Sequence, residues 1–234
     1  MTRVLITGAN RGLGLVLARH LIARGDQVWG TARDAQPEAL LALGPAGSVT
    51  MDLADEASIV GAVAAVAAQT PAIDLLINCA GIDARALGAS AAGRGPFDLD
   101  GDTFTAVTRI NATGPMIVTR EALPLLRKGT QPTVLNISSQ LGSMVVGASM
   151  GNDTAYCVSK AALNMFTVKA AAALRNEGIT VVAMHPGWVR TDMGGDAAPL
   201  SSDESATSII SVVDGLTIGD TGRFLKWDGS EHPW

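Results

Sequence analysis

The chain opens with a short apolar run, a glycine-rich turn and a segment of helical periodicity, in that order. The run is RVLIT at 3–7, the turn is TGANRGLG at 7–14, and apolar residues then recur at helical spacing from Leu13 to Ala23. Glycines allow a tight turn and a close approach of the backbone to a pyrophosphate, which the positive end of the following helix stabilises. This order predicts a parallel α/β fold whose first turn binds a dinucleotide.

The same alternation of apolar strand and helical segment continues along the whole chain. Further strands are predicted at Gln27–Ala32, Val49–Met51, Ile73–Ile77, Pro132–Ser138, Ile179–His185 and Arg223–Trp227. Further helices are predicted at Glu56–Ala68, Asp102–Leu126, from about Tyr156 to Glu177, and at Ala206–Ile218. Loops are predicted at 84–101 and 142–153, and a mobile substrate lid at 193–205. We therefore expect a doubly wound parallel sheet of about seven strands with helices on both faces, in a single domain spanning 1–234, with a substrate loop and helix near 193–218.

Composition narrows the classes of partner. The net charge is −5 and no block of consecutive Lys/Arg occurs, which argues against nucleic-acid and anionic-membrane binding. The longest apolar stretch, Ala57–Ala68, is shorter than the ~20 residues that span a bilayer. The N-terminus lacks the pattern of a signal peptide, so we expect a cytoplasmic protein. Cys79 and Cys157 show no CxxC or metal-ligand spacing and are interpreted as structural thiols, with no metal site.

The only tyrosine, Tyr156, precedes Lys160 by four residues. On a helix this spacing places both side chains on one face, where a cation lowers the pKa of a phenol from its usual ~10. Such a pair is a tunable proton donor and acceptor. A half-buried tyrosine beside a surface lysine would show the same spacing, and the pair alone does not decide between the two.

The residues after the second predicted strand bear on the choice of cofactor. NAD-binding turns usually carry an acidic residue there, whereas this chain has Arg33. A guanidinium suits a 2′-phosphate, and Arg11 in the glycine turn could add a second cation. Both favour NADP(H) over NAD(H), although Asp34 follows directly and surface arginines would look alike. A P-loop is excluded because no Gly-Lys-Ser/Thr follows the glycines.

Five motifs together resemble the short-chain dehydrogenase/reductase family in content and order, over essentially the whole chain. They are TGANRGLG at 7–14, NCAG at 78–81, the serine pair at 138–139, YCVSK at 156–160 and HPGWVRTDM at 185–193. The NISSQLGS stretch and the ending GRFLKWDGSEHPW are similar to the single-domain carbonyl-reductase branch, including its C-factor-like members. The resemblance implies a Rossmann-type fold.

The resemblance also implies the catalytic residues. Tyr156 matches the acid/base, Lys160 the residue that lowers its pKa and holds the nicotinamide ribose, and Asn111 the support of a water-linked proton relay. Ser139 matches the serine that polarises the substrate carbonyl. It lies farther before the tyrosine than in many members, with the extra length in 147–153, and the choice of Ser139 over Ser138 stays open.

The implied function is reduction of a ketone or aldehyde, or the reverse oxidation of an alcohol, with NADP(H). The alternative is a non-catalytic NADP(H)-binding regulatory or signalling protein. The partner is a small carbonyl or alcohol compound, and the family pattern allows a homodimer, a homotetramer or a monomer. Val145, Val146, Trp188 and Met193 would form either an apolar substrate pocket or core. Implied cofactor contacts are Gly8, Asn10, Arg11, Gly12, Leu13, Gly14, Arg33, Asp52, Leu53, Asn78, Ala80, Gly81, Tyr156, Lys160, Pro186, Gly187, Val189 and Thr191.

Overall fold

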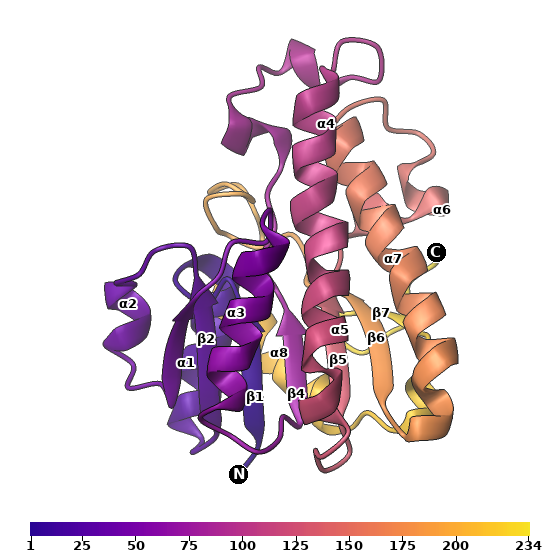
Figure 1. The fold of residues 1–234 in the computed structure, drawn as a ribbon. Helices are drawn as coiled ribbons and strands as arrows, with labels where there is room; N and C mark the ends of the chain where they lie inside the picture. Colours follow the sequence, from indigo (N-terminus) through magenta and orange to yellow (C-terminus); the bar gives the residue numbers. More distant parts are fainter.

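The computed structural model describes residues 1–234 and contains one seven-stranded sheet in which every neighbouring pair is parallel (Figure 1). The strand order is β3-β2-β1-β4-β5-β6-β7. This confirms the predicted fold class. The strands are β1 Arg3–Thr7, β2 Gln27–Ala32, β3 Gly47–Thr50, β4 Leu75–Asn78, β5 Thr133–Ile137, β6 Thr180–His185 and β7 Phe224–Lys226.

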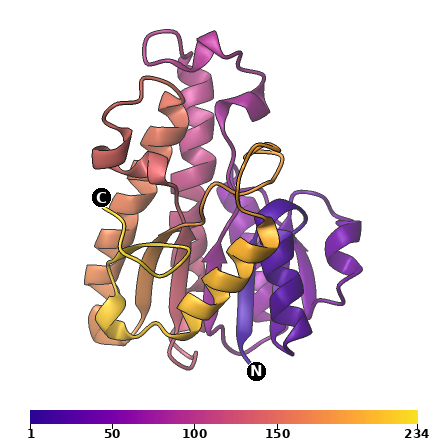
Figure 2. The same ribbon diagram turned by 180° about the vertical axis from the view of Figure 1, so that it is seen from behind.

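Helices cover both faces of the sheet. Figure 1 shows α3, α5 and α7 in front of it, and Figure 2 shows α1 and α8 on the opposite face. The helices are α1 Gly12–Ala23, α2 Glu38–Leu41, α3 Glu56–Ala67, α4 Gly101–Thr108, α5 Gly114–Leu126, α6 Met144–Gly147, α7 Thr154–Leu174 and α8 Ser202–Asp214. Short 3₁₀ turns are η1 Ala84–Leu87, η2 Ala92–Arg94, η4 Gln140–Gly142, η5 Arg175–Glu177 and η6 Ile218–Asp220, and η3 Arg109–Thr113 is a π turn.

Two apolar clusters hold the three layers together. Successive side chains of a strand point to opposite faces, so Leu5 joins the cluster under α3, α5 and α7, while Val4 and Ile6 join the cluster under α1 and α8. β4 divides in the same way, with Leu76 on the first side and Ile77 on the second. The continuous apolar runs of the sequence are therefore strands buried on both faces, as expected for a parallel sheet.

The strand order reverses at β1. β1 pairs with β2 on one side and with β4 on the other, so the loops after β1 and β4 leave the sheet in opposite directions. In doubly wound sheets, ligands bind at the carboxyl ends of the strands where the order reverses. The register places Thr7 beside Asn78 at this edge. The loops that follow β1, β4, β5 and β6 thus surround one position.

Several boundaries differ from the sequence prediction. The helix expected at 102–126 is α4, the π turn η3 and α5 in succession, and Pro124 lies in the last turn of α5. The loops expected at 84–101 and 142–153 contain η1, η2 and α6. α8 begins earlier than predicted, behind a capping box formed by Ser201 and Glu204. No helix has the length and apolarity needed to cross a membrane.

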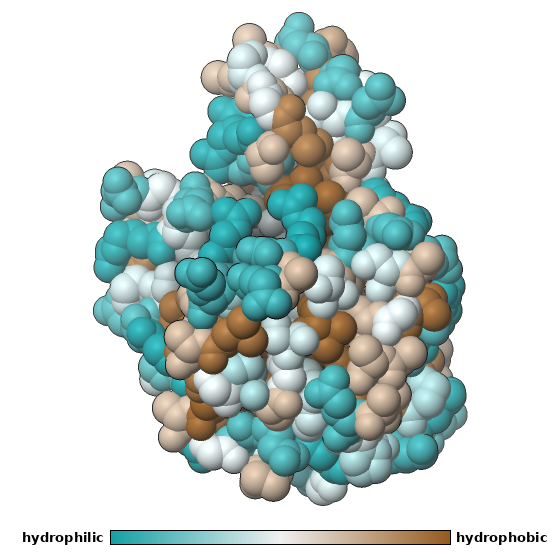
Figure 3. Space-filling view, turned by 60° about the vertical axis from the view of Figure 1, so that its left-hand side comes forward, coloured by the Kyte–Doolittle hydropathy of each residue, from teal (hydrophilic) through white to brown (hydrophobic).

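The segment from η1 to α4 rises above the sheet as a projection (Figure 1). Figure 3 shows apolar side chains gathered at the narrowing between this projection and the body of the molecule. The narrowing lies on the side of the carboxyl ends of the strands.

Candidate active site

β5 and α7 bring the predicted catalytic residues together. β5 ends at Ile137, and the buried Lys160 ammonium donates a hydrogen bond of 2.8 Å to the Ile137 carbonyl. The Lys160 Nζ atom lies 5.7 Å from the centroid of the Tyr156 ring. One helical turn separates the two residues on α7, as their spacing predicts. The sheet edge therefore carries a phenol and an amine side by side.

Burial controls the protonation of this pair. Burial raises the pKa of Tyr156 to about 12, the hydrogen bond with Ser139 acts in the opposite direction, and the charge of Asp83 raises the pKa further. Burial also lowers the pKa of Lys160 to about 8. Desolvation, which disfavours the charged phenolate, is the largest influence on the phenol, and the effect of Lys160 on the pKa of Tyr156 stays a prediction.

The two serines after β5 point to different partners. The Ser138 hydroxyl donates a hydrogen bond of 2.6 Å to Asn164 Oδ1 on α7 and is buried. Ser139 caps η4 by accepting from the Leu141 amide at 3.1 Å, and its hydroxyl lowers the pKa of the Tyr156 phenol. Ser138 is thus bound to α7 in the interior, whereas Ser139 is the serine that acts on the phenol, and its catalytic role stays a prediction.

Asn111 lies in the π turn and is fully buried. Its Oδ1 accepts from the Ile82 amide at 2.8 Å, and its Nδ2 donates to the Ile82 carbonyl at 2.7 Å and to Ser159 Oγ at 3.0 Å. Ser159 in turn donates to the Tyr156 carbonyl at 2.7 Å. Asn111 therefore ties the loop after β4 to α7, next to the candidate acid/base. π turns often occur at functional sites.

The glycine turn packs closely against the chain after β4 and against itself. Gly8 has φ +70°, and a Cβ there would lie 2.9 Å from the Ala80 Cα. A Cβ on Gly14 would lie 2.2 Å from the Gly8 carbonyl oxygen. Helix α1 receives no side-chain cap from Arg11, so its first amides stay available to an anion. The turn, which also contains Asn10, Gly12 and Leu13, fits the pyrophosphate of a dinucleotide.

The two predicted phosphate-binding arginines differ in their surroundings. Arg33 follows β2, is exposed and takes part in none of the ion pairs. The carboxylate of Asp34 accepts from the Gln36 amide at 2.9 Å. Arg11 is paired with Asp192 at 2.9 Å, and both side chains are largely exposed. Of these two arginines, Arg33 is thus the one whose guanidinium has no competing carboxylate.

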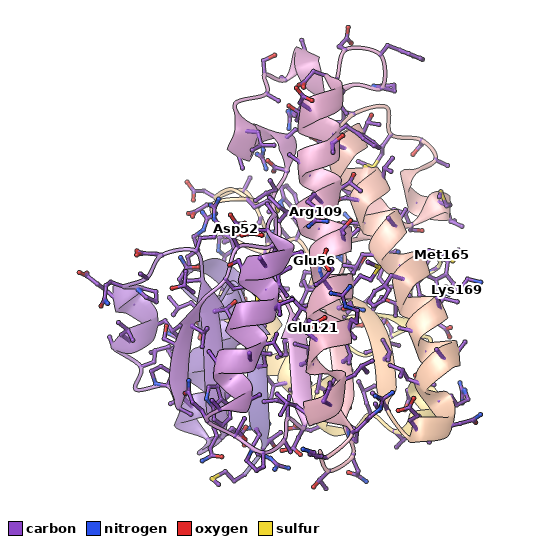
Figure 4. The ribbon with its side chains drawn as sticks, in the orientation of Figure 1. Asp52, Glu56, Arg109, Glu121, Met165 and Lys169 are labelled. Atoms are coloured by element: carbon purple, nitrogen blue, oxygen red, sulfur yellow. The ribbon has the colours of Figure 1, made fainter.

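The adenine and ribose side of the crevice contains Asp52, Leu53 and Asn78. Asp52 Oδ1 accepts from the Ala54 amide at 2.9 Å, and Figure 4 shows Asp52 at the upper end of the sheet. Leu53 is buried in the apolar cluster under α3 and α5. The Asn78 amide donates to Thr119 and Asn136. Its Nδ2 therefore stabilises the interior.

The predicted contacts Ala80 and Gly81 lie beside the catalytic groups. Thr7 Oγ1 accepts from the Ala80 amide at 3.2 Å and so fixes the chain after β4 against the end of β1. A Cβ on Gly81 would lie 3.2 Å from Asn111 Oδ1 and 3.5 Å from Lys160 Nζ. A side chain at this position would therefore press on Asn111, which would have to move by a few tenths of an ångström.

The chain after β6 crosses to the glycine turn. The Pro186 carbonyl accepts from Ser205 Oγ at 2.7 Å, and Gly187 has φ +89°. Val189 is buried and forms a β-bridge with Leu200. A Cβ on Gly12 would lie 3.7 Å from Thr191 Cγ2, which places Thr191 beside the glycine turn.

Three residues beside the site were not predicted from the sequence: Asp83, Arg85 and Ser159. Asp83 is buried and its charge acts on Tyr156, and Arg85 forms an ion pair with it. For Asp83 and Arg85, the available signal was a charged pair two residues apart that begins two residues after the small residues NCAG. No group of three or more His, Cys, Asp or Glu side chains could hold a metal ion.

Comparisons with known proteins agree with this geometry. The model of the short chain dehydrogenase family matches residues 2–200. The C-signal protein of Myxococcus xanthus is 40% identical over 167 residues, which cover 70% of this chain and 95% of that protein. The chain therefore belongs to the short-chain dehydrogenase family, a family of oxidoreductases.

Two solved structures are similar along their whole length. The NADPH-bound carbonyl reductase from chicken fatty liver superposes with a TM-score of 0.89 at 33% identity, covering 100% of this chain and 99% of that one. The carbonyl reductase Sniffer of D. melanogaster superposes with a TM-score of 0.90 at 30% identity and covers 100% of both chains. The fold is thus that of the carbonyl-reductase-like branch.

Proposed function

We propose that the protein is an NADPH-dependent reductase of ketones or aldehydes, able to run in the direction of alcohol oxidation. The observation that carries the proposal is the meeting of Ser139, Tyr156 and Lys160 at the carboxyl edge of the sheet, next to Asn111. The NADPH-bound chicken enzyme supports the choice of cofactor and of carbonyl substrates.

The residues present fit the cofactor. The glycine turn and the uncapped start of α1 would hold the pyrophosphate, and Arg33 would pair with the 2′-phosphate. Lys160 would hold the nicotinamide ribose. A bound NADPH supplies the hydride that reduces the carbonyl carbon.

The protein's own groups provide the proton and stabilise the developing charge. Tyr156 is protonated at neutral pH because burial raises its pKa to about 12, so it is ready to donate to the carbonyl oxygen. Ser139 donates a second hydrogen bond to the same oxygen, an oxyanion-stabilising role. Asn111 holds the backbone beside the pair and supports reprotonation of the phenol through water.

The substitution Tyr156→Phe tests the proposal. It keeps the ring and deletes the proton, so we expect turnover of carbonyl compounds to fall by about 10²-fold or more. The dissociation constant for NADPH and the unfolding midpoint should stay near wild type. The measurement is loss of NADPH absorbance with a panel of ketones and aldehydes, alongside NADPH binding by fluorescence. Turnover in the variant close to wild type would refute the role of Tyr156.

A signalling protein that binds NADP(H) without turnover is the second candidate, because of the 40% identity to the C-signal protein. The two candidates differ in one measurement. If the wild-type protein binds NADPH but oxidises it with none of the carbonyl compounds in the panel, the second candidate is favoured.

A further inference from the structure

The segment Trp188–Leu200, which we call the strap, links β6 to α8 and is held by two arginines from other loops. Arg11 of the glycine turn pairs with Asp192, and Arg85 of η1 donates a hydrogen bond of 2.7 Å to the Met193 carbonyl. Figure 2 shows the strap as the orange loop beside the start of α1. Two adjacent strap residues are thus bound by two different loops.

The two contacts differ in strength. The Arg11 and Asp192 side chains are 60% and 79% exposed, and ion pairs so exposed contribute little. Arg85 is also half-exposed, but its partner Asp83 has a side chain only 11% exposed. Asp83 accepts from the Arg85 amide and from its Nε, both at 2.9 Å, and pairs with Nη2 as well. Arg85 is therefore pre-oriented by a nearly buried carboxylate before it reaches the strap.

The same carboxylate belongs to the surroundings of the candidate acid/base. Asp83 directly follows Ile82, whose amide and carbonyl are both bound by Asn111. The charge of Asp83 raises the pKa of Tyr156, and Tyr156 in turn contributes to raising the pKa of Arg85. Arg85 thus connects the loop that Asn111 holds with the strap that contacts the glycine turn through Thr191.

The strap carries two exposed large apolar side chains, Trp188 and Met193. Trp188 is 53% exposed, and its indole Nε1 donates to the Gly194 carbonyl at 2.8 Å, while Met193 is 36% exposed. Because Arg85 binds the Met193 carbonyl, it sets the position of this residue relative to Asp83 and the catalytic groups. Loss of Arg85 would release the middle of the strap and leave the nearly buried carboxylate of Asp83 without its cation.

We propose that Arg85 is a positioning residue of the reaction: anchored on Asp83, it holds the strap closed over the substrate side of the active site. The proposal rests on the proposed reductase function for its kinetic part only. Arg85 acts through the strap and exchanges no proton with the substrate. Its loss should therefore weaken substrate binding more than it slows the chemical step.

The test compares Arg85→Met with Arg127→Met. Arg127 also pairs with a carboxylate, Glu177, and is 51% exposed, so it is a matched control remote from the strap. Because hydrogen bonds to charged groups are the stronger class, Arg85→Met should raise KM for a carbonyl substrate about tenfold with kcat within about threefold. Arg85→Lys, which keeps the charge but lacks the planar fork, should recover part of this loss. Arg127→Met should leave KM unchanged.

A second readout does not depend on activity. Limited chymotrypsin digestion should cut at Trp188 about tenfold faster in Arg85→Met than in Arg127→Met, because strap opening exposes the bond. Asp83→Asn should also speed cleavage at Trp188, and it replaces Arg85→Met in this test if Arg85→Met does not fold. Unchanged KM and unchanged cleavage in Arg85→Met would overturn the proposal. A wild-type protein without any NADPH-dependent turnover would overturn the reductase assignment instead, while the cleavage test would still decide the role of Arg85.

Discussion

Two neighbouring serines at the end of β5 give the site a natural internal control. Ser139→Ala should lower kcat by about 10²-fold, since loss of one oxyanion donor costs roughly 3 kcal/mol in transition-state stabilisation. Ser138→Ala should instead lower the free energy of unfolding by about 1–3 kcal/mol, because it leaves Asn164 Oδ1 unpaired in the interior. Steady-state kinetics and urea denaturation of both variants separate the two roles.

The contrasting result is a reversal of these effects. If Ser138→Ala lost turnover while its stability matched wild type, the hydroxyl of Ser138 would be the one that reaches the substrate. The sequence could not settle this choice because both serines follow the strand. The Asn164 side chain, 26 residues away on α7, makes the distinction.

Arg33 provides a test of cofactor preference. Arg33→Asp replaces a free guanidinium by the acidic residue typical of NAD-binding turns. We expect the dissociation constant for NADPH to rise by about 10²-fold, since the charge-assisted pair with the 2′-phosphate is lost and a repulsion is gained. The dissociation constant for NADH, which lacks the phosphate, should change by less than about threefold. Equal losses for both cofactors would show that Arg33 does not contact the 2′-phosphate.

At the scale of the elements, the sequence predicted strands and long helices well because their apolar residues repeat regularly. β1 and β2 have the predicted bounds, and α3 differs by one residue. The π turn around Asn111 was missed, because its five residues are too few to stand out against the periodicity of the helices on either side. α2 was missed, since it is a single turn that buries only Leu40.

The strap shows the limit of reading a loop from composition. Its glycines, prolines and serines indicated a mobile lid at 193–205. The lid stays a prediction, but the structure shows contacts that hold this chain: the Val189–Leu200 bridge, Arg190, which donates to the Ala198 and Pro199 carbonyls, and Arg85, which donates to the Met193 carbonyl. These contacts either join residues that are far apart in the sequence or are made to backbone atoms. The local sequence pattern therefore does not predict them.

At the scale of the whole molecule, the alternation of strands and helices predicted the parallel sheet and its crevice, because connections between parallel strands follow few rules. The sequence did not predict which side chains come into contact only because their strands are neighbours in the sheet. His185 at the end of β6 is one of them: its ring lies 5.6 Å from that of His232, six residues after Lys226, the last residue of β7. Its Nδ1 is buried and has no hydrogen-bond partner.

His185 makes the stability of the molecule sensitive to acid. Burial, followed by the charges of His232 and Lys226, lowers its pKa from about 6.5 to about 4, and Asp228 acts in the opposite direction. Between these two pKa values, His185 binds a proton in the unfolded chain but not in the folded protein. Stability is therefore complete above pH 6.5 and is lost as the pH falls toward 4, by up to roughly 3 kcal/mol from this residue.

The measurement is the free energy of unfolding in urea at pH 7 and at pH 4.5, for wild type, His185→Phe and His20→Gln. Carboxylates also lose stabilising interactions in acid, so the quantity that reports His185 is the difference in pH dependence between wild type and variant. His185→Phe removes the titrating group from the interior and should flatten that dependence. His20 is a surface residue beside Asp203, and its replacement should leave the slope through this window nearly unchanged. If the free energy of unfolding depended on pH equally in wild type and His185→Phe, protonation of His185 would not be the source of the acid sensitivity.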